Sequence, residues 1–178
     1  SRLGEAKSAE QHLHEALARA PESLKAASLL ARIRLAQRDL AGAEEALRSV
    51  ADKTPGSIEA RLTMAEFYLA ARRLEEAEKE FRAALTINPK HVQALLGTAA
   101  VAALRGQPEE AGNIYRKVSG SGAPGYRYLY GAYLFNTGKR EAAVTEFETI
   151  ARENPGDRNA RARLIAAYLY ASRRDDAE

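Results

Sequence analysis

The stretch RLTMAEFYLAARRLEEAEKEFRAALTINP, residues 61–89, contains two apolar stripes separated by a short polar turn. Spacings of three and four residues place the members of each stripe on one face of a helix. The stripes are Met64, Ala65 and Tyr68 in the first segment and Ala77, Phe81 and Ala84 in the second. Pro89 ends the second segment, because proline lacks the N–H that would continue a helix. The stretch therefore predicts a helical hairpin.

The same pattern recurs along the chain. Pro21, Pro55 and Pro89 are each 34 residues apart, and Pro155 follows 66 residues after Pro89, with the shortfall in the glycine-rich segment 119–125. A small residue stands in one phase of this period, where it lets two helices approach closely: Ala9, Ala43, Ala77, Ala111, Ala143 and Ala177. A period of this length predicts stacked hairpins, each packed only on its neighbours.

The order of residue types resembles the tetratricopeptide repeat (TPR): a large and a small residue, an aromatic, Ala-x3-Phe and then proline. The second full repeat matches best, through Met64, Ala65, Tyr68, Ala77, Phe81 and Pro89. The chain departs from this pattern in lacking the early tryptophan, in having Arg34 at an aromatic position, and in a third repeat with Thr98, Ala102 and no proline in phase. The resemblance covers nearly the whole chain and implies an all-α fold, a right-handed superhelical solenoid of stacked antiparallel helix hairpins.

We expect a single TPR array over residues 1–178. It would hold a second helix without its first at 5–20, a partial repeat at 158–178, and full repeats at 24–55, 58–89, 92–121 and 124–155. Because the chain begins with Ser and its repeats are rich in alanine and arginine, we expect a fragment of a longer, bacterial protein.

Composition excludes several classes of protein. The 27 basic and 24 acidic residues leave a formal charge of +3, and the absence of cysteine excludes disulfides and thiolate chemistry. The chain has no apolar stretch of about 18 residues, as a membrane span requires, and no signal-peptide core. We expect a soluble chain, with the choice between cytoplasm and periplasm or envelope left open.

Two motifs invite a chemical interpretation. Residues 120–125 match G-x-G-x-x-G, but that motif binds dinucleotides only between a strand and a helix, and here a helix precedes it. His12, His14 and His91 lack the partner four residues away that a zinc-binding helix supplies. We therefore expect no cofactor, no metal, no small-molecule substrate and no catalysis.

The resemblance implies that the first helix of each hairpin lines a concave groove that binds a peptide or helical segment of a partner protein. The residues at the groove positions that we select as ligand contacts are Arg32, Leu62, Glu66, Leu96, Tyr128 and Phe135. The family's carboxylate-binding members use Lys, Asn and Arg there, and only Arg32 of this chain matches them. Apolar anchors are therefore the better expectation, although some of these side chains could instead pack between adjacent helices.

An alternative function follows from basic residues at the hairpin turns: Arg38, Arg72, Arg73, Arg105, Lys139, Arg140, Arg173 and Arg174. Such an edge would attract RNA or another anionic partner. Acidic residues follow directly, however, and helical RNA readers place paired polar residues where this groove has Leu96, Ala100 and Ala132. Nucleic acid is the less favoured partner.

The two ends suggest self-association. The segment 5–20 has the second-helix stripe, Ala9, Leu13 and Ala16, and the segment 158–172 has the first-helix stripe, Leu164, Ile165 and Tyr168. Each stripe lacks its usual partner, so we expect head-to-tail association caused by truncation, with a symmetric dimer as the alternative.

Overall fold

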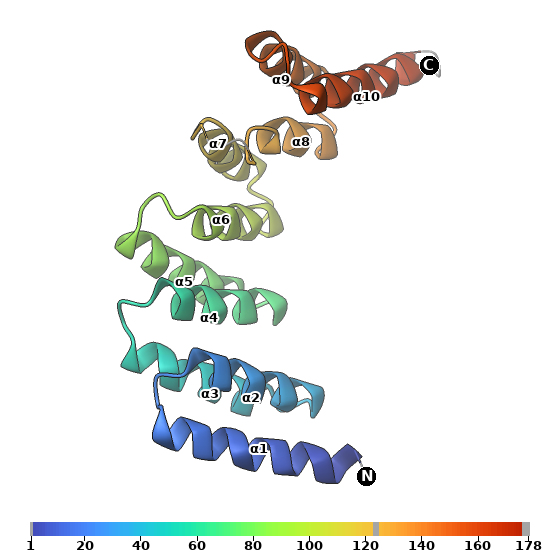
Figure 1. Ribbon diagram of the computed structural model, residues 1–178. Coiled ribbons are helices and arrows are strands. Elements are labelled where there is room, and N and C mark those ends of the chain that lie inside the picture. Colours follow the sequence, from blue (N-terminus) through green and yellow to red (C-terminus); the bar gives the residue numbers. More distant parts are fainter. Residues whose placement is uncertain (1, 123–124, 176–178) are drawn as a thin grey trace. The chain divides into compact units, whose positions relative to one another are not determined.

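The computed structural model describes residues 2–122 and 125–175, so Ala177 and residues 123–124 of the glycine-rich segment lie outside the described residues. Ten helices occupy the described part of the chain, and no strand is found in it (Figure 1). They are α1 (Arg2–Arg19), α2 (Leu24–Ala36), α3 (Leu40–Lys53), α4 (Ile58–Ala70), α5 (Leu74–Ile87), α6 (Val92–Leu104), α7 (Pro108–Ser119), α8 (Leu129–Asn136), α9 (Arg140–Glu153) and α10 (Arg158–Asp175).

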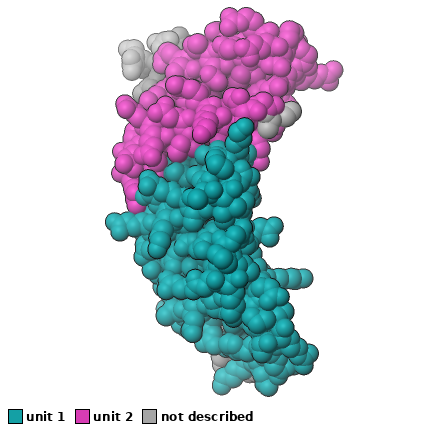
Figure 2. Space-filling view, turned by 90° about the vertical axis from the view of Figure 1, so that its left-hand side faces the viewer, with its two compact units in different colours: residues 1–101 teal, residues 102–178 magenta. Residues whose placement is uncertain are grey.

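The chain forms two compact units, residues 1–101 and 102–178, with the boundary inside α6 (Figure 2). In the first unit α1 to α5 pack against one another in chain order, each helix on the next. In the second unit α7, α8, α9 and α10 do the same. Each unit is thus built from contacts between sequence neighbours, as expected for a helical repeat.

The alanines of the recurring phase are fully buried between helices. Ala43, Ala77, Ala111 and Ala143 are each 0% exposed. Bulky side chains four residues later fill the space beside them, with Leu47, Phe81 and Phe147 between 2% and 4% exposed. Small and large residues alternate on one helix face, so backbones approach at the first and side chains interlock at the second.

The first helices begin at capping residues in the same phase. The Oγ atoms of Ser23 and Ser57 accept hydrogen bonds from the third backbone N–H that follows, at 3.4 and 3.2 Å. The Oδ1 atom of Asp157 accepts one from Ala160 at 3.2 Å, and Nδ1 of His91 accepts one from Ala94 at 3.4 Å. These bonds satisfy N–H groups that have no partner inside the helix.

The turns inside the hairpins share a residue with a left-handed backbone conformation, that is, with a positive φ. Its φ is 73° at Gly106 and 80° at Gly138, and the same place in the two preceding hairpins is held by Arg38 and Arg72, with φ of 65° and 60°. Glycine adopts this conformation at little cost, whereas a side chain is strained in it. The local geometry of the turn therefore recurs even where its sequence does not favour it.

Arg34 replaces the expected aromatic with an ionic contact. Its guanidinium lies 3.1 Å from Asp39 at the following turn and 3.3 Å from Glu10 of α1. At the same phase one repeat later, the hydroxyl of Tyr68 donates a hydrogen bond to Glu44 at 2.9 Å. Both residues thus link a first helix to an acidic side chain of the preceding second helix.

Candidate functional site

The first helices α2 and α4 border a cleft of about 300 Å³ in the first unit, here called the α2–α4 cleft. Most of its lining is apolar, and the full set is Ser28, Ala31, Arg32, Leu35, Leu40, Leu47, Thr63, Glu66, Phe67, Ala70 and Ala71. Leu35 and Leu40 are 41% and 56% exposed, whereas Phe67 is 9% exposed. Exposed large apolar side chains around a concave surface are typical of a site that binds an apolar group.

Two of the residues predicted from the sequence, Arg32 and Glu66, lie in this lining. Both side chains are exposed. Among the described residues, the structure shows no hydrogen bond or ion pair for either of them. An unpaired cation and an unpaired anion therefore flank an apolar cleft.

Leu62 and Leu96 lie elsewhere. Leu62 is 7% exposed and belongs to the hydrophobic core of the first unit, and Leu96 is a half-buried residue of α6 outside the lining of the α2–α4 cleft. The helix turns Leu62 inward, so Thr63, Glu66 and Phe67 present the cleft side of α4. The structure brings together only the two charged members of the predicted set.

Tyr128 and Phe135 make contacts within the second unit. The Tyr128 hydroxyl donates a hydrogen bond to Asp157, and the guanidinium of Arg163 lies 4.8 Å from the centre of its ring. The Phe135 ring packs edge-on against Tyr170, with 5.4 Å between ring centres. Both predicted anchors therefore connect α8 to α10, and a ligand would have to displace these contacts to use them.

The hydrogen bond between Tyr128 and Asp157 contributes to shifts in the pKa of both groups. The hydrogen bond from Tyr128, followed by the bond from the Ala160 backbone, lowers the pKa of Asp157 from its ordinary value of 3.8. Burial, followed by the bond to Asp157, raises the pKa of Tyr128. Asp157 is therefore ionised while it caps α10 and holds α8 beside it.

The arginine-rich edge is partly neutralised by the chain itself. Arg73 forms ion pairs with Glu44 and Glu76, and its guanidinium lies 4.7 Å from the centre of the Tyr68 ring. Burial raises the pKa of Glu44, but hydrogen bonds from Arg73 and Tyr68 outweigh it, so the net shift is downward. Arg73 thus stabilises the first unit, and the structure lends no support to an RNA-binding edge built on it.

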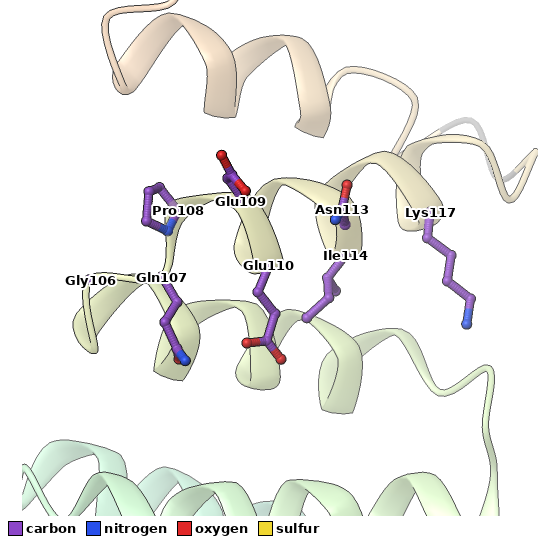
Figure 3. A pocket seen from close by; sticks show the side chains of 8 residues that line it. All are labelled: Gly106, Gln107, Pro108, Glu109, Glu110, Asn113, Ile114 and Lys117. Carbon is purple, nitrogen blue, oxygen red and sulfur yellow. The ribbon is translucent and has the colours of Figure 1, made fainter.

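A second concave surface, of about 750 Å³, runs along α7 (Figure 3). Its eight lining residues all come from α7 and the turn before it, residues 106–117. In Figure 3 Gln107, Glu110, Ile114 and Lys117 project to one side of the helix, whereas Glu109 and Asn113 project to the other. Because a single helix supplies the whole lining, this surface has no opposing wall to hold a ligand, and we prefer the α2–α4 cleft as the site.

The structure shows no metal centre in the part of the chain that it describes. No group of three or more His, Asp or Glu side chains is arranged there to hold an ion. In the same residues, no helix is both long and apolar enough to cross a membrane.

Sequence reasoning missed Leu35, Leu40 and Phe67. Leu35 lies three residues after Arg32, on the same face of α2, so extending the groove stripe to the end of this helix would have identified it. Leu40 is the first residue of α3, and Phe67 precedes the aromatic of the repeat pattern. No periodic signal marks these two as cleft residues.

Comparison with protein families identifies the repeat. One tetratricopeptide repeat model matches residues 34–84, and another matches residues 1–58 and 62–124, which together make up more than half of the chain. None of the curated proteins matches the sequence.

Solved structures share the fold over almost the whole chain. A thermophilic TPR protein of Thermus thermophilus, TTC0263, is 23% identical, with coverage of 94% of this chain and 93% of its own and a TM-score of 0.59. PilF of Pseudomonas aeruginosa is 18% identical (98% and 80% covered, TM-score 0.65). YrrB, described as a TPR protein with an unusual peptide-binding site, is 18% identical (93% and 86% covered, TM-score 0.57). The helical hairpins, the family models and these structures agree that the chain belongs to the tetratricopeptide repeat family and has its all-α solenoid fold.

Proposed function

We propose that the α2–α4 cleft holds an apolar side chain of a peptide or helical segment from a partner protein. Tetratricopeptide repeats are generally non-catalytic scaffolds for protein interactions, and the family models match most of this chain. YrrB, a similar structure, is described as having an unusual peptide-binding site. This similarity supports a peptide as the class of ligand for the present chain.

The observation that carries the proposal is the exposure of Leu35 and Leu40, at 41% and 56%, around a mainly apolar cleft. A cleft of about 300 Å³ is at the lower end of the size range of ligand pockets and has room for a side chain of leucine or phenylalanine size. Burying such a side chain contributes about 1.5–3 kcal/mol, so one anchor supports a weak, reversible interaction.

Arg32 and Glu66 would set the orientation of the bound segment. Because opposite charges flank the cleft, a segment with an acidic residue on the Arg32 side and a basic residue on the Glu66 side is favoured over the reversed one. Exposed pairs of this kind select among ligands more than they strengthen binding.

The test is a selection from a displayed library of random peptides against the full chain, followed by calorimetry with the selected peptides. Leu35→Glu is expected to weaken binding at least about tenfold, which equals the loss of about 1.4 kcal/mol. Ile87→Glu is the matched control, because Ile87 is 42% exposed on α5 and does not line the cleft. Selected peptides that bind the two variants equally well would contradict the proposed site.

A further inference from the structure

The charged residues of α2 and α4 divide into two groups. Arg34 of α2 pairs with Asp39 at 3.1 Å, and Arg61 of α4 pairs with Glu80 of α5 at 3.0 Å. The other charged side chains of these two helices are exposed, and within the described residues the structure shows no hydrogen bond or ion pair for them. They are Lys25, Arg32, Glu59 and Glu66. The fold thus leaves these four charges accessible to a partner.

The four charges form two rows of opposite sign. Lys25 and Arg32 are seven residues apart on α2, and Glu59 and Glu66 are seven residues apart on α4. Seven residues make almost two helical turns, so each row lies along one face of its helix and spans about 10.5 Å. Arg32 and Glu66 also line the α2–α4 cleft. A basic row on α2 and an acidic row on α4 therefore accompany the apolar cleft.

The two rows do not neutralise each other. Lys25 and Glu59 stand at the same phase of two successive repeats, as do Arg32 and Glu66, yet no ion pair joins them in the described structure. Helix α3, which packs on both α2 and α4, contributes Leu40 to the lining of the cleft. The surface therefore offers an apolar contact together with two separate sets of opposite charges.

A helix suits this surface better than an extended chain does. The side chains of an extended chain point alternately to two opposite faces, so they cannot enter the cleft and reach both rows together. The side chains of a helix point in all directions around its axis, and residues seven apart return to nearly the same flank at the spacing of each row. A helix along the cleft can place apolar residues against the lining, acidic residues beside α2 and basic residues beside α4.

Building on the proposed function of the α2–α4 cleft, we propose that its partner segment is an amphipathic helix with acidic residues seven apart on one flank and basic residues seven apart on the other. The two rows then fix the direction in which this helix lies. Turning the helix end for end exchanges its flanks, so each of its charges would meet a row of the same sign, and this direction is repelled. Charged flanks select partner and orientation in coiled coils in the same way.

Two synthetic peptides of identical composition test the charge pattern. Both are alanine-based helices of about 16 residues, long enough to be helical in isolation, with two leucines four residues apart. The sorted peptide has two glutamates seven apart on one flank and two lysines seven apart on the other, whereas each flank of the mixed peptide has one of each. In NMR titrations of the full chain at low salt, the sorted peptide is expected to bind about five to ten times more tightly. This preference should fall below about twofold at 1 M salt, where the Debye length is about 3 Å.

Reversing the four charges tests the direction of binding. The reversed chain carries Lys25→Glu, Arg32→Glu, Glu59→Lys and Glu66→Lys, all at exposed positions, and circular dichroism checks that it is folded. Because the chain has no cysteine, Ala36→Cys at the exposed end of α2 takes a single spin label. The label should broaden the NMR signals of one end of the sorted peptide on the wild type and those of the other end on the reversed chain.

The control exchanges two charges away from the cleft. Glu75 and Lys79 are exposed on α5 and do not line it, so Glu75→Lys combined with Lys79→Glu should bind the sorted peptide like the wild type and in the same direction. Leu35→Glu is expected to weaken both peptides alike, because both use the apolar contact.

Failure of the charge rows and failure of the cleft give different results. Sorted and mixed peptides that bind equally well, while both lose affinity in the Leu35→Glu variant, overturn the proposal for the charge rows and leave the proposed function standing. A sorted peptide that keeps its direction on the reversed chain does the same. If Leu35→Glu weakens neither peptide, the cleft is not the site, and both proposals fail. If neither peptide binds at all, the helical partner is refuted, and the peptides selected from the library decide the proposed function separately.

Discussion

Replacing Gly97 of α6 by alanine is expected to destabilise the first unit, although alanine is the better helix former. A Cβ atom at this position would lie 2.1 Å from Cε1 and 2.2 Å from Cζ of Phe81. The Phe81 ring is 2% exposed and held in the core, so it has little room to move away. Overpacking of this kind costs about 1–3 kcal/mol, whereas the gain in helix propensity is about 1 kcal/mol.

Because contacts of 2.1 and 2.2 Å are far too short, we expect a cost in the upper part of this range, about 2–3 kcal/mol. The net loss for Gly97→Ala should therefore be about 1–2 kcal/mol, or roughly 2–8 °C in the melting temperature of a chain of this size. Phe81→Leu is expected to rescue it, because leucine lacks the two nearest atoms, Cε1 and Cζ, and its Cδ methyl groups can rotate away, unlike Cδ1 of the rigid Phe81 ring, which would lie 2.6 Å from the new methyl group. The preceding repeat supports this reasoning. Leu47 corresponds there to Phe81, and Thr63 corresponds to Gly97, so a leucine at the first position occurs together with a residue that has a Cβ atom at the second.

The assay is urea unfolding of the wild type, the two single variants and the double variant. In the Phe81→Leu background, Gly97→Ala should be neutral or stabilising, which amounts to a coupling of about 2 kcal/mol between the two sites. Gly112→Ala is the control, because its nearest neighbour would be Cε1 of Tyr133 at 3.2 Å and only a small adjustment is needed. A Gly97→Ala variant as stable as the wild type, or additive effects in the double variant, would refute the packing argument.

Three further predictions concern packing, turn geometry and acid stability. Ala143→Leu should lower the free energy of unfolding by about 1–3 kcal/mol, because Ala143 is 0% exposed. Its control, Ala142→Leu on the exposed side of α9, should be nearly neutral. Equal melting curves for the two variants would contradict the repeat phase. Arg72→Gly should stabilise the chain by about 1 kcal/mol by relieving a φ of 60°, and Gly106→Arg, at the same phase with a φ of 73°, should destabilise it by a similar amount in chemical unfolding. Because the pKa of Asp157 is lowered in the folded state, its stabilising effect is present above its ordinary pKa of 3.8 and is lost as the pH falls through the folded value. Asp157→Asn should therefore reduce the dependence of the melting temperature on pH below about pH 4, and an unchanged dependence would count against the proposed role of this carboxylate.

The sequence alone was sufficient for the fold class and the family. A period that repeats through residues such as Ala43, Ala77 and Ala143 identifies the face that each helix buries, and all three are fully buried in the structure. Periodicity has this power because each hairpin packs only on its neighbours, so the local pattern contains most of the information about packing. The expected all-α hairpin fold and the tetratricopeptide repeat family are both confirmed.

The partners of individual side chains were decided by the tertiary structure. Sequence phase placed Leu62 on the groove, but a side chain near the boundary of a helix face turns inward or outward according to the neighbouring helices, and Leu62 lies in the core. Phase also placed Tyr128 among the ligand contacts, whereas Asp157 and Arg163, some thirty residues later, bind its hydroxyl and ring. The α2–α4 cleft depends on Leu40 at the start of the next helix, a position that no groove stripe includes. Periodicity identifies the face of a helix, but only the packed neighbours determine which of its side chains are left for a ligand.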